Sequence, residues 1–184
     1  MARSVKGIYR AFDFAFGVNP DAGGALQVVG GGGAASSTYS IICSPTGGES
    51  SDGKPCAIST NTPITIGGDS GLETVTPTSV SLNGLGQVVI TAAFTFAHGV
   101  GAQVRSGSYG LGEAVAYVNS KGGGVIAIDA DWKTAGGVNA TITGLTGFTN
   151  TFILDARGSL SGSAFSYKAA TNGANYAATT ISWY

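Results

Sequence analysis

The chain has 184 residues, of which 43% are hydrophobic and only 10% are charged, and its formal net charge is −1. Charged residues usually make up about a quarter of a chain, and here 31 glycines replace many of them. Without a basic block, the sequence lacks the charge that nucleic-acid binding requires. No stretch approaches the roughly 20 apolar residues of a membrane helix, and the first residues lack the apolar run of a secretory signal. We therefore expect neither a nucleic-acid nor a membrane partner.

Residues 1–20 are predicted to form an N-terminal arm or edge strand. Phe12, Phe14 and Phe16 alternate with smaller or polar residues, which is the periodicity of a strand, and Asn19-Pro20 ends the run. Three phenylalanines on one face must be buried. An edge strand of the same chain would bury them, and so would an exchanged arm lying on a neighbouring subunit. We expect the first arrangement for residues 12–16 and the second for the residues before them.

Residues 21–104 are predicted to form a small antiparallel β barrel or sandwich. Pro77 interrupts one of the expected strands, which indicates an edge strand or a bulge at that point. Asn83-Gly84 is a strong signal for a tight turn. The tetraglycine at 30–33 lacks the following Lys-Ser/Thr of a phosphate loop and is expected to connect two strands. The expected strands are residues 25–29, 37–42, 57–59, 64–66, 73–80 and 87–96.

The two cysteines, Cys43 and Cys56, flank a polar, glycine-rich loop. Their spacing is compatible with a disulfide that would contribute roughly 3 kcal/mol through loop entropy. Two free thiols in a protein assembled in cytoplasm are the alternative. The sequence leaves both open.

Residues 105–184 are predicted to form an αβ unit with C-terminal strands packed on it. Leu111, Val115 and Val118 have helical spacing, with Glu113 on the opposite, polar side in the first turn. Gly122-Gly123-Gly124 ends the helix, and Val125 to Ile128 then forms a short buried strand. Further strands are expected at 151–155, 159–168 and 176–184. The aromatic C-terminus should pack within the domain or against a partner.

Few titratable groups converge in the sequence, so we predict no cofactor, no metal and no enzymatic activity. His98 is the single histidine, and no Gly-x-Ser-x-Gly motif accompanies it, so a hydrogen-bonded turn histidine is favoured over a catalytic one. Asp129 and Asp131 could chelate a hard cation, but a turn-forming role is favoured. Tyr109, Tyr117 and Trp132 could stack on sugars, although core packing is favoured.

The segment SYGLGEAVAYVNSKGGGVIAID, residues 108–129, resembles the first rung of pectate-lyase-like right-handed β-helices. Phage tailspikes and related virion proteins carry this rung as (T)xGLQEAIxxAxxxGGGVVxID. Residues 61–111 are also similar to segments of phage virion proteins. A full β-helix needs many stacked rungs, whereas only about fifty residues follow Trp132. The resemblance thus implies a virion protein and does not imply the substrate groove of a lyase.

These features predict a structural protein of a tailed-phage virion, most simply a capsid decoration or head-fibre subunit. It would act as a homo-oligomer, a trimer in the simplest case, bound to major capsid or other virion proteins and assembled in the host cytoplasm. A tail-fibre, tailspike or baseplate component that binds host-surface glycan is the alternative. The residues expected at subunit or capsid contacts are Arg3, Lys6, Tyr9, Arg10, Phe12, Phe14, Phe16, Ile181, Trp183 and Tyr184.

Overall fold

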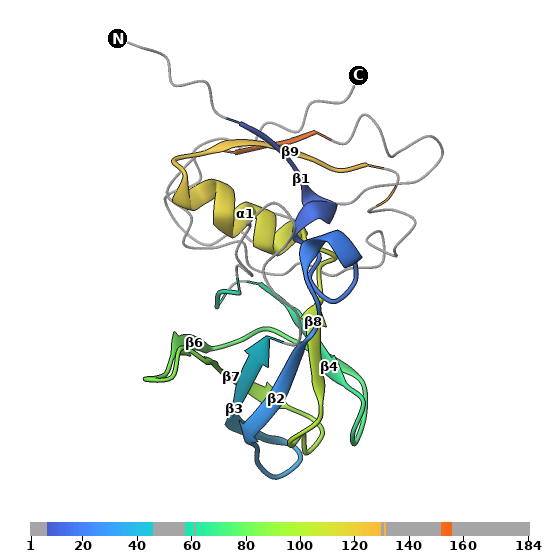
Figure 1. Ribbon diagram of the computed structural model, residues 1–184, viewed down its shortest axis with the longest axis vertical. Coiled ribbons are helices and arrows are strands. Elements are labelled where there is room, and N and C mark those ends of the chain that lie inside the picture. The colour runs from blue at the N-terminus through green and yellow to red at the C-terminus, as the bar shows by residue number, and fades with distance from the viewer. Residues whose placement is uncertain (1–6, 46–57, 61, 130, 132–151, 156–184) are drawn as a thin grey trace.

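The computed structural model describes residues 7–45, 58–60, 62–129, 131 and 152–155, and it consists mainly of β-strands with one short α-helix. Figure 1 shows two lobes, one built on a seven-stranded antiparallel sheet and one in which the helix lies against a small parallel sheet. The predicted class, mainly β with one helix in an αβ unit, is confirmed. No helix among the described residues is long and apolar enough to cross a membrane.

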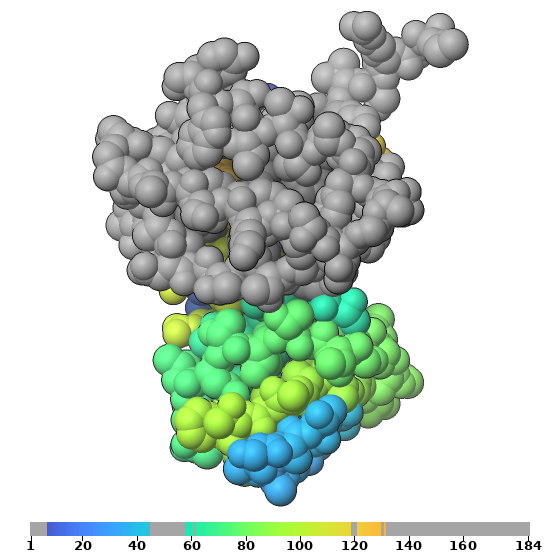
Figure 2. Space-filling view, turned by 180° about the vertical axis from the view of Figure 1, so that it is seen from behind, coloured from blue at the N-terminus to red at the C-terminus, as the bar shows by residue number. Residues whose placement is uncertain are grey.

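The larger lobe is a curled antiparallel sheet with the strand order β5-β4-β8-β2-β3-β7-β6. Apolar residues at alternate positions on most of these strands point inward and form one core, which includes Val28, Ile41, Ile64, Ile90 and Val104. Its strands are β2 (Leu26–Gly31), β3 (Ser37–Pro45), β4 (Ile64–Gly67), β5 (Glu73–Val75), β6 (Ser79–Leu82), β7 (Val88–Phe94) and β8 (Gln103–Ser106). In the space-filling view this lobe forms the lower half of the molecule, with the β2–β3 hairpin in blue at its tip (Figure 2).

The two edges of this sheet come together because the edge strands β5 and β6 are consecutive in the chain. Only residues 76–78 separate them, and three residues span at most about 10 Å. Pro77 lies in this link and, lacking an N–H, cannot continue the hydrogen-bonded ladder. The same extended segment therefore pairs with β4 on one side and with β7 on the other. The sheet curls into a barrel, one of the two predicted arrangements.

The smaller lobe contains β1 (Ile8–Arg10), α1 (Leu111–Ser120), β9 (Gly124–Ala127) and β10 (Phe152–Asp155). Both β1 and β10 pair in parallel with the central strand β9. Leu111, Val115 and Val118 of α1 are buried against Ile126 and Ile128, which confirms the predicted helix and the strand that follows it. The predicted strand at 151–155 is also confirmed, whereas those at 159–168 and 176–184 lie outside the described residues.

The N-terminal segment differs from the predicted strand over residues 12–16. Ala11–Phe14 is a 3-10 helix, η1, and a second one, η2, spans Pro20–Ala22. Because a 3-10 helix has three residues per turn, the alternating phenylalanines do not share one face. Phe14 enters the core of the smaller lobe, Phe16 enters the barrel core, and Phe12 is half-buried against the former. The residues just before them, β1, form an edge strand of the chain's own sheet.

Two other expectations are wrong. Ile58 and Ser59 are not in a strand, because the Thr62 side chain binds the backbone of Ser59 at both its N–H and its carbonyl and bends the chain there. Glu113 does not lie on an exposed polar face of α1 but is fully buried. Cys43 is a buried free thiol, and burial raises its pKa to about 12. Cys56 lies outside the described residues.

Candidate functional site

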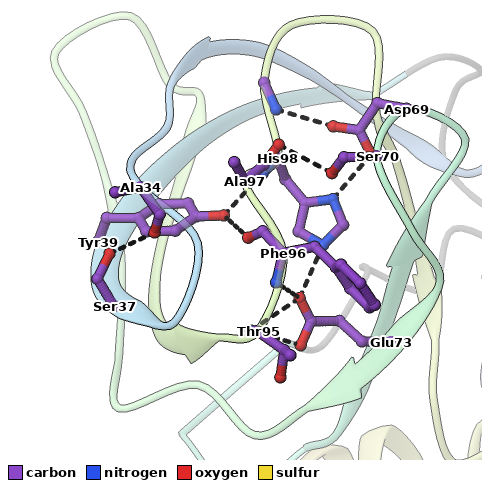
Figure 3. Close-up of polar contacts among 11 residues, drawn as sticks. Ala34, Ser37, Tyr39, Asp69, Ser70, Glu73, Thr95, Phe96, Ala97 and His98 are labelled. Carbon is purple, nitrogen blue, oxygen red and sulfur yellow. Dashed lines mark hydrogen bonds and ion pairs between the residues drawn. The ribbon is translucent and has the colours of Figure 1, made fainter.

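A cluster of polar side chains lies where β5 approaches the end of β7, and we call Asp69, Glu73 and His98 the seam cluster (Figure 3). β6 pairs with β7 only over residues 88–91, so the later part of β7 faces β5 without a backbone ladder. Asp69 belongs to the β4–β5 turn, Glu73 begins β5, and His98 follows the end of β7. The cluster thus lies across the seam at which the barrel closes.

Both ring nitrogens of His98 contact a carboxylate. Nδ1 lies 2.8 Å from an oxygen of Asp69, and Nε2 lies 2.9 Å from an oxygen of Glu73. The ring itself is 0% exposed. A neutral imidazole has one N–H and one lone pair, so only the doubly protonated ring can donate to both carboxylates at once.

The two carboxylates also accept hydrogen bonds from the backbone. Glu73 accepts from the N–H groups of Thr95 and Phe96, at 2.9 to 3.1 Å, so its side chain takes the position of a missing strand partner. Asp69 accepts from the N–H of Gly99 at 2.9 Å. Charge-assisted bonds of this kind are stronger than neutral ones. The seam is closed by side chains where the backbone ladder stops.

These contacts determine the direction of both carboxyl pKa values. Burial is the largest influence on the pKa of Asp69 and acts to raise it, but hydrogen bonds from His98, Gly99 and Ser70 together hold it below the ordinary value. For Glu73, burial also acts to raise the pKa, and the bonds from Phe96, Thr95 and His98 outweigh it and lower the pKa. Both groups are therefore carboxylates at neutral pH.

Tyr39 on β3 extends the network. Its hydroxyl accepts from the N–H of His98 at 2.8 Å and donates to the carbonyl of Phe96 at 2.6 Å. Its ring stacks on Phe94, with the ring centroids 4.5 Å apart. Burial is the main cause that raises the pKa of Tyr39, and so it keeps the hydroxyl protonated and able to donate.

This geometry fits a cluster that holds the barrel closed better than it fits a catalytic triad. In a Ser–His–Asp triad one ring nitrogen faces a serine hydroxyl, whereas in the seam cluster both face carboxylates. The nearby Ser70 hydroxyl donates to the carbonyl of Ala97 at 2.9 Å. Among the described residues, no group of three or more His, Cys, Asp or Glu side chains is arranged to hold a metal ion. His98 is the hydrogen-bonded turn residue favoured from the sequence.

No sequence pattern indicated the partners of His98. Asp69 and Glu73 precede it by 29 and 25 residues, and only closure of the barrel brings them to the ring. Asp69 lies between the expected strands 64–66 and 73–80, and Glu73 begins the second of them, but neither position indicates a contact across the seam. The one available signal is Pro77, which lies between two strands, β5 and β6, that form the two opposite edges of the sheet.

Asp129 and Asp131, considered as a cation site, both bind Arg10. Nε of Arg10 donates to Asp129 and Nη2 donates to Asp131, each at 2.6 Å, and Nη1 lies 3.3 Å from Asp13. The hydrogen bond to Asp129 is the main cause that raises the pKa of Arg10. The guanidinium ties β1 to the end of β9 within one chain, and because it is 46% exposed the pairs contribute little to stability.

The other residues expected at contacts fall into three groups. Phe14 and Phe16 are buried in the chain's own cores, and Tyr9 and Phe12 are half-buried against the core of the smaller lobe. Tyr109 and Tyr117, considered for sugar stacking, also pack against that core. Those outside the described residues are Arg3, Lys6, Trp132, Ile181, Trp183 and Tyr184.

No family model, no curated protein and no solved structure matches the chain. The interpretation of the site therefore rests on its geometry.

Proposed function

We propose that the chain is a non-enzymatic structural subunit of a tailed-phage virion, most simply a capsid decoration or head-fibre protein. The observation that carries the proposal is the exposure of large apolar side chains on a barrel whose polar cluster is satisfied internally. Ile8, Leu72, Leu82, Leu85 and Val100 are each at least 65% exposed. On a chain with so few charged residues, such a surface favours cover by neighbouring subunits.

The exposed apolar residues of the barrel lie in separate regions. Leu82 is the last residue of β6, Leu85 lies in the β6–β7 turn, and Leu72 lies just before β5. Because β5 and β6 follow one another along one extended segment, Leu72 and Leu82 lie at its opposite ends, up to roughly 30 Å apart. Two separate apolar regions suit contacts with more than one neighbour, as in a closed ring or a shell. A homotrimer bound to capsid protein is the simplest assembly of this kind.

The parallel pairing in the smaller lobe agrees with the resemblance to virion proteins. β10 pairs with β9 in parallel and in register, from Phe152 opposite Gly124 to Asp155 opposite Ala127. Such stacking of parallel strands is what a β-helix repeats. Residues 108–129 form a helix, a glycine stop and the strand β9, which pairs in parallel with β1 and β10.

The occupancy of purified phage particles tests the proposal. We expect the chain to be present in many copies per particle, and the double variant Leu82→Ser, Leu85→Ser to lower that copy number at least tenfold without unfolding the domain. Deleting residues 2–6 should also reduce occupancy, because it removes Arg3 and Lys6 but no described core residue. A deletion of residues 2–16 is unsuitable, since it removes β1, Phe14 and Phe16.

Quantitative mass spectrometry of the particles provides the readout, and the variant Gln103→Ser is the control, because it changes an exposed polar side chain on β8. Particles that contain none of the chain, or contain the leucine variant at the wild-type copy number, would overturn the proposal.

A further inference from the structure

Glu113 is a charged residue type placed at a fully buried position in the first turn of α1. The chain passes from β8 of the barrel into α1 through residues 107–110, and Figure 1 shows this crossing between the lobes. Ser106 and Ser108 lie at the crossing, and their hydroxyls accept from the N–H groups of Gly110 and Gly112. The backbone of Thr62, just before β4, lies close to Gly112. A Cβ added to Gly112 would lie 3.4 Å from the Cα of Thr62. Glu113 thus sits where the helix meets the barrel.

The Glu113 carboxyl has one good hydrogen bond. The Ser108 hydroxyl donates to Oε2 at 2.8 Å, whereas Oε1 has no hydrogen-bond partner among the residues that the structure describes. A buried carboxylate normally accepts several hydrogen bonds or pairs with a cation. The site therefore suits the neutral carboxyl better than the charged carboxylate.

Within the described part of the chain, no charged neighbour compensates for this burial. The titratable residues with described side chains on α1, on the segments flanking it and on the elements packed against them are Tyr9, Arg10, Asp13, Arg105, Tyr109, Tyr117, Lys121 and Asp129. None of them contributes to the pKa shift of Glu113. Arg10 binds Asp13, Asp129 and Asp131 instead.

We propose that Glu113 is a pH-sensitive latch between the first turn of α1 and the barrel, closed when its carboxyl is neutral and loosened when the carboxyl loses its proton to water. Ionisation places a negative charge in a fully buried site, where the support from Ser108, Ser106 and the Glu113 backbone is outweighed by the cost of burial. Movement of the first turn away from residues 62 and 106–108 would let water reach that charge. The latch does not depend on the assembly role of the chain.

The direction of the pH dependence follows from burial, which is the main cause that raises the pKa of Glu113 from 4.5 to about 7. Between these two values the unfolded chain is ionised while the folded chain stays protonated, so stability falls as pH rises through that range. A difference of about 2.5 pH units corresponds to a change of roughly 300-fold in the equilibrium between closed and open forms.

The test compares the wild-type chain with Glu113→Gln, which keeps the shape and cannot ionise. Unfolding equilibrium constants from denaturant titrations at pH 4.5 and pH 8.5 should show that the ratio of wild-type to Gln constants rises by up to about 300-fold. Amide exchange at residues 106–114, referenced to the same variant, should show the loosening at the crossing. A ratio that does not change with pH would overturn the latch.

A second measurement needs no variant. The chain has three glutamates, Glu49, Glu73 and Glu113, so carboxyl ¹³C spectra of glutamate-labelled protein are simple. One side-chain carboxyl should titrate near pH 7, well above the ordinary range. If all three titrate below pH 5.5, the latch does not exist.

Discussion

At the scale of single residues, His98 is a core residue whose two ring nitrogens hold a turn and a strand together through their carboxylates. Its imidazole joins a turn and a strand start that lie 29 and 25 residues earlier in the chain. Because Asp69 and Glu73 each bind backbone N–H groups as well, loss of the ring would leave two carboxylates facing each other in a mostly buried place. Removing one partner from a buried ionic contact costs about 3 to 5 kcal/mol.

The variant His98→Phe should therefore lower the free energy of unfolding by about 3 kcal/mol. Phenylalanine keeps a ring in the packed position and removes both N–H donors. Ser70→Ala is the matched control, since it removes one exposed hydrogen bond to Ala97 and should cost about 1 kcal/mol or less. Chemical denaturation at pH 7 measures both. Equal costs for the two variants would contradict the closure role of His98.

Acid should weaken the same contact. Asp69 and Glu73 have pKa values below their ordinary 3.8 and 4.5, so their stabilisation is complete above those values and is lost as pH falls through the lower folded values. The cost of His98→Phe should accordingly shrink below about pH 4. This acid effect is opposite in sign to that of Glu113, whose stabilisation is lost as pH rises.

At the scale of elements, the start of α1 depends on close packing against η1. Gly110 has a φ of +90°, and a Cβ there would meet the carbonyl oxygen of Ala11 and lie 2.7 Å from the backbone nitrogen of Ala15. Gly122, just after the helix, has a similar φ of +83° but nothing within 4 Å of an added Cβ. The two glycines separate the cost of backbone conformation from the cost of close approach.

The variant Gly122→Ala should cost about 1 kcal/mol for the left-handed backbone alone. Gly110→Ala should cost at least about 3 kcal/mol, because η1 and α1 must also move apart. Thermal unfolding of the two variants gives the comparison. If they melt within a degree of each other, the contact between η1 and the helix start is not tight.

Several elements could be predicted because their signals are local. The spacing of Leu111, Val115 and Val118 predicted the helix, and period-two apolar residues predicted the main barrel strands. The 3-10 helix at residues 11–14 could not be distinguished from a strand, because Phe14 and Phe16 pack into two different cores that the sequence does not separate. The burial of Glu113 could not be predicted, because glutamate side chains are normally exposed. The seam cluster depended on how the sheet closes, which no local pattern indicates.

At the scale of the whole molecule, the two lobes are joined by short segments that belong to both cores. Phe14 packs in the smaller lobe and Phe16 in the barrel, and the carbonyl of Phe16 accepts from the N–H of Ser106 at 3.0 Å, at the end of β8. Motion at the helix start is therefore coupled to the barrel through these two crossings. The barrel keeps its polar contacts internal and leaves apolar side chains exposed, as expected for a subunit that assembles.

Cryo-electron microscopy of purified phage particles that contain the chain tests the central claim, an assembled role in the virion. We predict density for the barrel in many copies that follow the symmetry of the shell or of a head fibre, with Leu82 at the end of β6 and Leu85 in the turn after it lying against a neighbouring subunit. Complete particles with no density for the barrel, or with these leucines facing solvent in every copy, would contradict it.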